Sequence, residues 1–264
     1  MTADATASSP PSRQPGRRSH REGAFFHMTI TSSDNPAIKE LKRLQSSHAR
    51  SRADVFAAEG EDLIEMAAAN GWKPERVLVR EGCGLDGEEV EAELLDSVSS
   101  LGSGTRAIGI FTKAYVPEVT SGLLVHLAGL SDPGNVGTII RSAHALGATG
   151  VSLGPETADP FGPKAVRASM GSVFAVPLHT GVAVSELPGR KVALAGGEAT
   201  SVRVLPEGDL VLIVGSERAG LDPKTLELSD LIWSIPMADG AESLNAAVAV
   251  SIALHAANRI PGNA

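Results

Sequence analysis

The sequence predicts an α/β protein that contains a parallel sheet, and two observations support this prediction. Short apolar runs, each bounded by Gly, Pro or Asp, alternate with helix-like segments through the second half of the chain. Near-continuous apolar strands of this kind are typical of parallel sheets that are buried on both faces. The composition, with 28 Gly, 16 Pro and 42% hydrophobic residues, indicates many turns and enough apolar material for one large or two modest domains.

Residues 1–27 are predicted to form a disordered leader, because they carry Ser, Pro and Arg without apolar periodicity. They have no apolar central region, which argues against a secretory signal. The sequence favours a non-essential extension ahead of a second start at Met28, and an organelle transit peptide is the alternative.

Residues 28–112 are predicted to form a small α/β domain, and residues 113–122 a linker. The stretch SDNPAIKELKRLQ reads as a helix with Ser33 or Asp34 as its cap and Pro36 in its first turn. Further helices are expected over 61–70 and 88–98, and strands over 56–60, 76–80 and 107–111.

Residues 123–264 are predicted to form the second domain, in which strands and helices alternate. Strands are expected over 123–130, 150–153, 173–178, 192–195, 210–214 and 232–235. Ligands of open parallel sheets bind outside the carboxyl ends of the strands. The loops that follow these strands are therefore where a functional site is expected.

The stretch GCGLDG, residues 82–87, matches the G-x-G-x-x-G pattern of dinucleotide-binding turns. The helix expected after it opens with Glu88, Glu89 and Glu91, and carboxylates at that helix end would repel a pyrophosphate. A glycine-rich surface loop is the preferred interpretation, and a nicotinamide-dependent oxidoreductase is the rival function that this motif would support.

Four polar stretches follow predicted strands. Each has an ordinary explanation, such as a helix cap or a solvated loop, but all four are expected at one edge of one sheet. Asn135 is interpreted as a helix cap, with Arg141 near the second turn. The residues concerned are Asn135 and Arg141, Lys164 and Arg167, Gly215 and Glu217, and Ser243 and Asn245.

Three of these stretches resemble, in order, the motifs of the SpoU or TrmH family of RNA ribose 2′-O-methyltransferases. They read N-x-G-x-x-x-R at residues 135–141, G-x-E-x-x-G-L at residues 215–221, and I-P-M…S-L-N at residues 235–245. The resemblance covers residues 121–260. Residues 28–112 resemble, more loosely, the substrate-binding domain that precedes the catalytic domain in members acting on ribosomal RNA.

The resemblance implies a SPOUT-type parallel sheet with a trefoil knot near its carboxyl end, a homodimer, and S-adenosyl-L-methionine as the cofactor. It also implies a cytoplasmic enzyme that methylates the ribose 2′-oxygen of structured RNA, with large-subunit ribosomal RNA as the preferred substrate. Transfer RNA methylation and a non-catalytic RNA-binding module are the alternatives. The cofactor contacts implied by position are Gly196, Gly215, Ile235, Met237, Ser243, Leu244 and Asn245.

The resemblance further implies catalytic roles for Arg141, Asn135, Glu217, Ser243 and Asn245. An Arg cannot serve as a base at neutral pH. Arg141 is therefore expected to bind the phosphate next to the target ribose and to stabilise negative charge on the attacking oxygen. Glu217 is expected to orient Arg141 or the cofactor pocket.

The net charge of −8 and the isoelectric point near 5.4 argue weakly against a nucleic-acid partner. A local patch departs from this average, because residues 28–52 hold five cationic side chains against two acidic ones. The predicted RNA-binding residues are Lys39, Lys42, Arg43, Arg50, Arg52, Arg141, Lys164 and Arg167. A single cysteine, Cys83, excludes an internal disulfide, makes a Cys-rich zinc site implausible and fits a reducing cytoplasm, while no apolar run approaches the length of a membrane helix.

Overall fold

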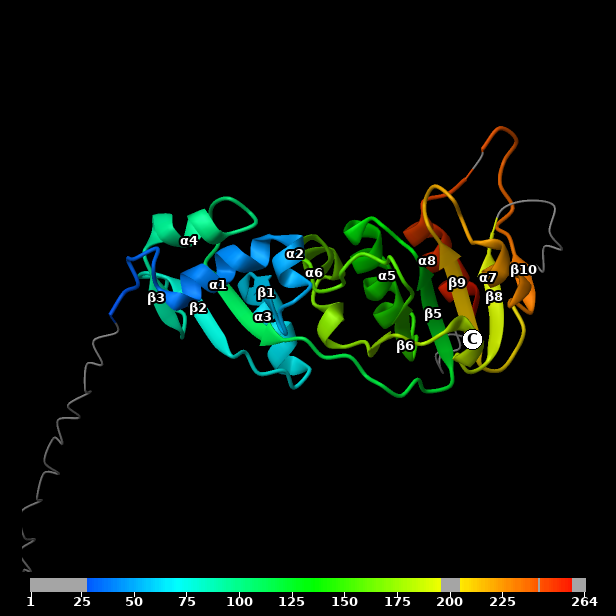
Figure 1. Cartoon of the computed structure of the whole chain (residues 1–264), viewed down its shortest axis with the longest axis horizontal. Helices are drawn as coiled ribbons and strands as arrows, with labels where there is room; N and C mark the ends of the chain where they lie inside the picture. Colours follow the sequence, from blue (N-terminus) through cyan, green and yellow to red (C-terminus); the bar gives the residue numbers. More distant parts are fainter. Residues whose placement is uncertain (1–27, 196–204, 242, 258–264) are drawn as a thin grey trace, which may run out of the picture.

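The computed structural model describes residues 28–195, 205–241 and 243–257. Within them, the chain forms two sheets that lie side by side along the long axis of the molecule (Figure 1). The N-terminal sheet has four strands, and the C-terminal sheet has six. All strand pairs of the second sheet are parallel, so the predicted α/β class with a parallel sheet is confirmed.

The N-terminal sheet has the strand order β1-β4-β2-β3. Strands β1 and β2 run antiparallel to β4, which lies between them, and β3 pairs with β2 in parallel. The elements of this part are β1 (Val55–Glu59), β2 (Arg76–Arg80), β3 (Glu88–Val90), β4 (Ala107–Thr112), α1 (Pro36–Gln45), α2 (Ser47–Arg50), α3 (Glu61–Ala69) and α4 (Ala92–Val98).

Two local predictions in this part are wrong. The cap of α1 is Asn35, whose side chain accepts a hydrogen bond from the backbone of Ala37, and not Ser33 or Asp34. The helix expected over 88–98 begins only at Ala92, because residues 88–90 pair with β2 as a strand. The glycine-rich turn at residues 82–87 therefore leads into a strand, so the dinucleotide-binding interpretation lacks the helix N-terminus that it requires.

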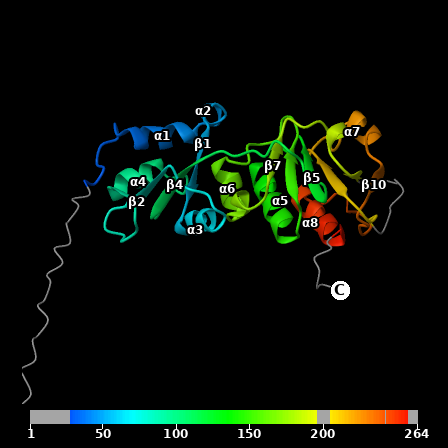
Figure 2. The same ribbon diagram turned by 90° about the horizontal axis from the view of Figure 1, so that it is seen from below.

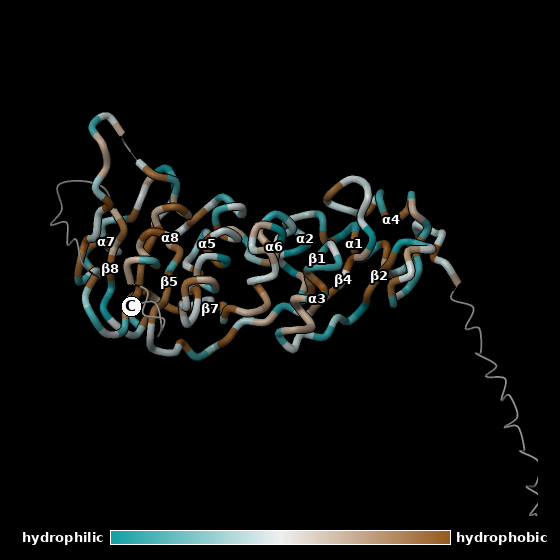
Figure 3. Tube along the Cα trace, turned by 180° about the vertical axis from the view of Figure 1, so that it is seen from behind, coloured by the Kyte–Doolittle hydropathy of each residue, from teal (hydrophilic) through white to brown (hydrophobic). Residues whose placement is uncertain are grey.

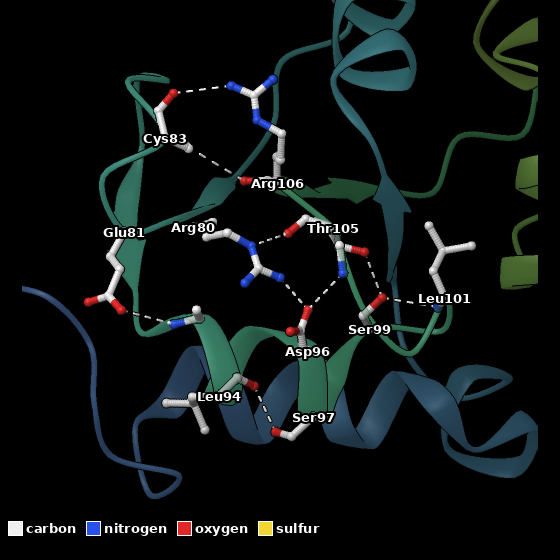
Figure 4. A network of polar contacts seen from close by, with 12 residues as sticks. Arg80, Glu81, Cys83, Leu94, Asp96, Ser97, Ser99, Leu101, Thr105 and Arg106 are labelled. Carbon is white, nitrogen blue, oxygen red and sulfur yellow. Dashed lines mark hydrogen bonds and ion pairs between the residues drawn. The ribbon is translucent and has the colours of Figure 1, made fainter.

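A polar network fixes the loop that follows α4 (Figure 4). The guanidinium of Arg80 binds the Asp96 carboxylate and the carbonyl of Thr105. Ser99 donates to Glu59 at 2.7 Å, and its hydroxyl lies 2.7 Å from that of Thr105. Since Ser99 and Thr105 are buried, these bonds satisfy polar groups that would otherwise destabilise the fold.

The C-terminal sheet has the strand order β10-β8-β9-β5-β6-β7. Every residue of β9 is buried, as expected for a strand in the middle of a covered parallel sheet. The elements of this part are β5 (Leu123–Ala128), β6 (Gly150–Leu153), β7 (Leu178–Thr180), β8 (Arg190–Leu194), β9 (Leu210–Gly215), β10 (Leu231–Trp233), α5 (Pro133–Ala145), α6 (Pro163–Ser169), α7 (Pro223–Glu227), α8 (Ala246–Ala257) and the short 3-10 helices η1 (Ser172–Phe174) and η2 (Val184–Glu186).

Two further predictions are wrong in this part. The strand expected over 173–178 is mostly a 3-10 turn, and the strand itself starts only at Leu178, after Pro177. The cap of α5 is Asp132, whose carboxylate accepts from the backbone of Gly134, so Asn135 lies inside the helix. The apolar character of Val173 and Phe174 reflects burial between the two parts of the molecule rather than membership of the sheet.

One hydrophobic core extends through both parts of the molecule. Phe56 and Phe111 of the N-terminal sheet pack against Phe161 and Phe174, with ring centroids 4.6 Å apart for Phe56 and Phe161 and 5.1 Å apart for Phe111 and Phe174. The indole of Trp72 donates a 2.8 Å hydrogen bond to the carbonyl of Phe174. Helix α6 lies at this junction in both views (Figure 2). The two parts are therefore held in one arrangement by buried contacts.

Hydrophobic segments of the chain coincide with strands of both sheets, and hydrophilic segments lie mainly in the outer turns (Figure 3). None of the helices in the described residues is long and apolar enough to cross a membrane.

A buried histidine of β5 makes stability depend on pH. His126 lies 3.1 Å from the Ser152 hydroxyl, and burial lowers its pKa from 6.5 to about 4. The unfolded chain therefore binds a proton in a range where the folded chain does not. The contribution of His126 to the free energy of unfolding is fully present above about pH 6.5. It decreases as the pH falls towards about 4, by on the order of 2–3 kcal/mol.

The variant His126→Leu cannot titrate at this position. We expect its free energy of unfolding, measured by urea denaturation, to fall less than that of the parent protein between pH 7 and pH 4. The matched control is His48→Leu, in which an exposed histidine of α2 is replaced. Equal pH dependence of His126→Leu and the parent protein would contradict this account.

Candidate active site

A pocket of about 560 Å³ opens at the carboxyl ends of β8 and β9, where the parallel topology places a ligand site. Its volume falls within the range of roughly 300–1,000 Å³ that is usual for small-molecule pockets. It is lined by apolar side chains of Leu194, Val214, Leu221, Leu226, Trp233, Ile235, Met237 and Leu244, by polar residues Ser216, Glu217, Ser243 and Asn245, and by Ala195, Gly215, Ala219, Gly220, Ala246 and Ala249. In the described residues, no cluster of His, Cys, Asp and Glu is arranged to hold a metal ion.

The loop that leaves β9 is shaped by two glycines. Ser216 and Gly220 exchange backbone hydrogen bonds of 3.0 and 3.1 Å, which closes a tight turn. A side chain at Gly215 would lie 2.2 Å from the backbone carbon of Gly220, and Gly220 itself has a φ of +69°. Only glycine fits at Gly215 without moving the turn, and the positive φ favours glycine at the second position. The backbone of this turn can therefore lie against a ligand.

A second close approach explains the glycine of the first motif. A side chain at Gly137 would lie 2.2 Å from the carbonyl oxygen of Ala165, because α5 packs directly against α6. This contact sets the position of the whole helix, including Asn135 near its start.

A chain of hydrogen bonds joins one polar residue from each of the three motifs. The amide of Asn245 donates to the side-chain oxygen of Asn135 at 3.0 Å, and the amide of Asn135 donates to Glu217 at 2.9 Å. The Glu217 carboxylate also accepts from the backbone of Ser131 and of Asp132. Residues 110 positions apart in the sequence are thereby connected through side chains alone.

Glu217 is held in its charged form. Partial desolvation would raise the pKa of this carboxyl, but the hydrogen bonds from Asn135, Ser131 and Asp132 outweigh it and lower the pKa below the usual value. Since the carboxylate bridges the loops after β5 and β9, its charge stabilises the rim of the pocket.

Asn245 has a second function at the start of α8. Its side-chain oxygen accepts from the backbone of Ala247 at 2.9 Å and of Val248 at 3.3 Å, so it caps the helix. One amide thus fixes the end of α8 and reaches Asn135, which explains a polar residue at the beginning of an apolar helix.

The structure brings most of the predicted cofactor residues together. Gly215, Ile235, Met237, Ser243, Leu244 and Asn245 all line the pocket, and Gly196 lies outside the described residues. Binding of a cofactor by these side chains stays a prediction.

Arg141 does not line this pocket. It is exposed on α5, and within the described part of the chain its guanidinium makes no hydrogen bond or ion pair. It lies on the same helix face as Thr138, three residues earlier. That face borders a second, shallow groove between α5 and α8, whose lining includes Val248, Ile252 and His255. Glu217 is expected from the sequence to orient either Arg141 or the cofactor pocket. In the described structure it makes no bond to Arg141, binds Asn135 and lines the pocket.

Six of the eight predicted RNA-binding residues fall into three pairs. Lys42 and Arg52 are exposed, and Lys39 and Arg43 are exposed beside Asp34 and Glu40 of the same segment. Lys164 binds Asp132 near the pocket, and Arg167 contacts the Ser100 hydroxyl across the two parts of the molecule.

Arg50 is mostly buried and makes structural contacts. Its side chain is 12% exposed, donates to the carbonyls of Leu44 and Gln45 at the end of α1, and pairs with Asp159. These contacts give Arg50 a structural role, and its RNA contact stays a prediction.

Sequence reasoning missed several residues that the pocket uses. Leu194, Leu226 and Trp233 are lining residues that look like ordinary core positions in the sequence. Ser131 and Asp132 hold Glu217 through their backbone, which leaves no trace in residue type. The available signal was position for Leu194 and Trp233, which end β8 and β10, and for Ser131 and Asp132, which follow β5. Leu226 lies within α7 and carries no such signal.

Comparisons with known proteins match both parts of the chain. Residues 122–255 match the model of the SpoU rRNA Methylase family, and residues 35–136 match that of the MRM3-like substrate binding domain. The chain is 31% identical over 241 residues to the 23S rRNA (guanosine(2553)-2′-O)-methyltransferase RlmP of Bacillus subtilis, covering 86% of this chain and 97% of that protein.

Solved structures agree with these matches. The AdoMet-bound rRNA methyltransferase of Sinorhizobium meliloti superposes with a TM-score of 0.76 at 31% identity, covering 87% of this chain and 97% of that chain. The SpoU methyltransferase AviRb of Streptomyces viridochromogenes, solved in complex with AdoMet, superposes with a TM-score of 0.70 at 28% identity, covering 83% of this chain and 96% of that chain.

Proposed function

Because the chain belongs to the SpoU rRNA methylase family, we propose that it transfers a methyl group from S-adenosyl-L-methionine to a ribose 2′-oxygen of large-subunit ribosomal RNA. The observation that carries this proposal is the hydrogen-bonded chain from Asn245 through Asn135 to Glu217 at the rim of the pocket. It joins one polar residue from each of the three family motifs at the carboxyl edge of the parallel sheet. The names of relatives, and the substrate-binding domain matched by residues 35–136, support ribosomal RNA.

The pocket fits the proposed cofactor. Its apolar walls suit a purine and a thioether chain, and the glycine turn at 215–220 exposes backbone groups to a ligand. We assign cofactor binding to Gly215, Ile235, Met237 and Leu244, with Ser243 and Asn245 ordering the loop between the cofactor and the RNA. The chemistry supplied by bound S-adenosyl-L-methionine is an electrophilic methyl group on a positively charged sulfur, which becomes a neutral thioether on transfer.

The protein must then position and activate a weakly acidic hydroxyl. A guanidinium binds phosphate through a planar fork and stays charged at any physiological pH. We assign to Arg141 the phosphate beside the target ribose and the negative charge that develops on the attacking oxygen. Holding the oxygen in line with the methyl group contributes several kcal/mol to the rate enhancement. Glu217 acts indirectly as a positioning residue, because it orients Asn135 and the loops that form the pocket.

We further propose a homodimer in which each site uses both chains. Arg141 lies outside the pocket of its own chain, one turn after Thr138, which lines the groove between α5 and α8. Val248 and Ile252 are 46% and 38% exposed there, an apolar face that a second copy would bury. A partner on this face would bring its own Arg141 towards the pocket.

The variant Val248→Asp places a charge on that face, and we expect it to give monomers by light scattering where the parent protein gives dimers. The control Leu228→Asp changes another exposed apolar residue, at the end of α7, and should stay dimeric. Dimers of Val248→Asp as stable as those of the parent would place the interface elsewhere.

We assign RNA recognition to residues 28–112, with Lys39, Lys42, Arg43 and Arg52 as phosphate contacts beside Lys164 and Arg167. The family relationship also supports a trefoil knot near the C-terminal segment, whose Asn245 reaches back to Asn135 on α5. Because its proposed substrates are ribosomal RNA and S-adenosyl-L-methionine, we place the enzyme in the cytoplasm.

The proposal is tested by methyl transfer in vitro. The purified chain, given S-adenosyl-L-methionine with a tritiated methyl group, should label 23S ribosomal RNA lacking ribose methylation, and mapping of alkali-resistant bonds should locate one 2′-O-methyl nucleotide. Transfer RNA and small-subunit RNA serve as competing substrates. Labelling of transfer RNA alone would replace the proposed substrate, and binding of RNA without any labelling would support the non-catalytic alternative.

A further inference from the structure

The indole of Trp233 is an unusual feature of the pocket wall. Trp233 ends β10, at the edge of the C-terminal sheet, and is 6% exposed. Its indole nitrogen is buried and has no hydrogen-bond partner, which leaves it and His179 Nε2 as the unsatisfied buried side-chain atoms of the described residues. A buried donor without an acceptor destabilises a fold by about 1–3 kcal/mol, so such groups call for an explanation.

The position of Trp233 supplies that explanation. It lines the same pocket as Gly215 and Ile235, together with Leu194 and Leu226. Two polar side chains of the rim are engaged elsewhere, since Glu217 binds the loop after β5 and Asn245 caps α8. Solvent does not reach the indole nitrogen, so water does not replace the missing acceptor. Since none of the described residues supplies the acceptor, we look to a molecule that fills the pocket, with an adjustment of the wall that lets it reach the indole nitrogen.

The second tryptophan of the chain, Trp72, shows that a core indole usually has a hydrogen-bond acceptor. Trp72 donates its N–H to the carbonyl of Phe174 at 2.8 Å and lies at the junction of the two parts, away from the pocket. The same side chain is thus satisfied where its function is packing and unsatisfied where it borders a ligand site.

We infer that Trp233 is a cofactor-positioning residue that donates its indole N–H to a ring nitrogen of the adenine of S-adenosyl-L-methionine. This inference rests on the proposed function. The apolar walls around Trp233 suit a purine, and a purine ring nitrogen is a neutral acceptor without a proton. The indole therefore selects a ligand with an acceptor at this place and fixes the orientation of the base.

The first test compares affinities in the full chain. Trp233→Phe keeps an aromatic ring and removes the donor, and we expect it to weaken binding of S-adenosyl-L-methionine by about three- to tenfold in calorimetry. Trp72→Phe is the matched control, and it should lower the melting temperature while leaving the dissociation constant unchanged. Equal affinity of Trp233→Phe and the parent protein would overturn the inference while leaving the proposed function intact.

Lost packing could also weaken binding, so a second comparison isolates the hydrogen bond. Deaza analogues of S-adenosyl-L-homocysteine each replace one adenine ring nitrogen by carbon. We expect one of them to bind the parent protein more weakly than the natural compound, and to bind Trp233→Phe as well as the natural compound does. Losses that add for every analogue would assign the effect to packing and overturn the inference.

A measurement without any variant of Trp233 keeps the inference falsifiable if that variant fails to fold. With ¹⁵N-labelled indoles, the chain gives two side-chain N–H signals, and Trp72→Phe identifies which belongs to Trp233. Addition of S-adenosyl-L-methionine should move the Trp233 proton signal downfield and slow its exchange, because the N–H gains an acceptor. A bound cofactor with an unmoved signal refutes the inference, and absence of any binding refutes the proposed function together with it.

Discussion

Replacement of Arg141 by Ala should lower methyl transfer by at least about a hundredfold, while the dissociation constant for S-adenosyl-L-methionine changes by less than about twofold. The expectation follows from geometry, because Arg141 is exposed on α5 and does not line the pocket of its own chain. Its guanidinium makes no hydrogen bond or ion pair within the described residues, so stability should be unaffected. Single-turnover methylation and calorimetry measure the two quantities separately.

Two further variants sharpen this test. Arg141→Lys keeps the charge but loses the planar fork, and we expect an intermediate rate with weaker discrimination of the phosphate. Arg190→Ala removes an exposed arginine from the start of β8, at the amino ends of the strands and away from the pocket. It should retain full activity. Full activity of Arg141→Ala would refute its assignment.

Replacement of Glu217 by Ala should impair both cofactor binding and catalysis. Four hydrogen bonds reach this carboxylate, from the Ser131 backbone and hydroxyl, the Asp132 backbone and the Asn135 amide. Their loss leaves donors of two loops without their acceptor and frees Asn135 from its place beside Asn245. We expect cofactor affinity to fall about tenfold and the rate of transfer by at least about tenfold more. The control Glu227→Gln alters an exposed carboxylate of α7 and should change neither quantity.

The two variants together test whether the site is shared. In a mixed dimer of Arg141→Ala and Glu217→Ala chains, one site would combine the intact Glu217 of the first chain with the intact Arg141 of the second. Mixing should therefore restore about one quarter of parent activity, because half of the dimers are mixed and each has one complete site. No recovery after subunit exchange, shown by tagged chains, would mean that each site is built within one chain.

The sequence predicted the elements whose signal is local. Apolar runs predicted β5, β6, β8 and β9, since strands buried on both faces need apolar residues throughout. Prediction failed where tertiary contacts decide the structure. Val173 and Phe174 resemble a strand but pack at the junction of the two parts, and Glu88 resembles the start of a helix but pairs with β2.

The site was predictable in part for the same reason. The three motifs place Asn135, Glu217 and Asn245 after strands, and the topology of a parallel sheet then brings them to one edge. Their mutual hydrogen bonds could not be predicted, because each amide has several acceptors within reach and only the packed loops select among them. Trp233 was missed because an isolated tryptophan in an apolar run gives no indication that its N–H lacks a partner.

The aromatic cluster at the junction has a consequence for engineering. Phe56 and Phe111 come from one part of the chain, and Phe161 and Phe174 from the other, yet they form one packed group. A chimera that joins the first 112 residues of this chain to the catalytic half of a relative would bring together rings shaped for different neighbours. Transplanting a new RNA specificity would therefore require the four rings to travel as a set, together with Trp72 and the carbonyl that it binds.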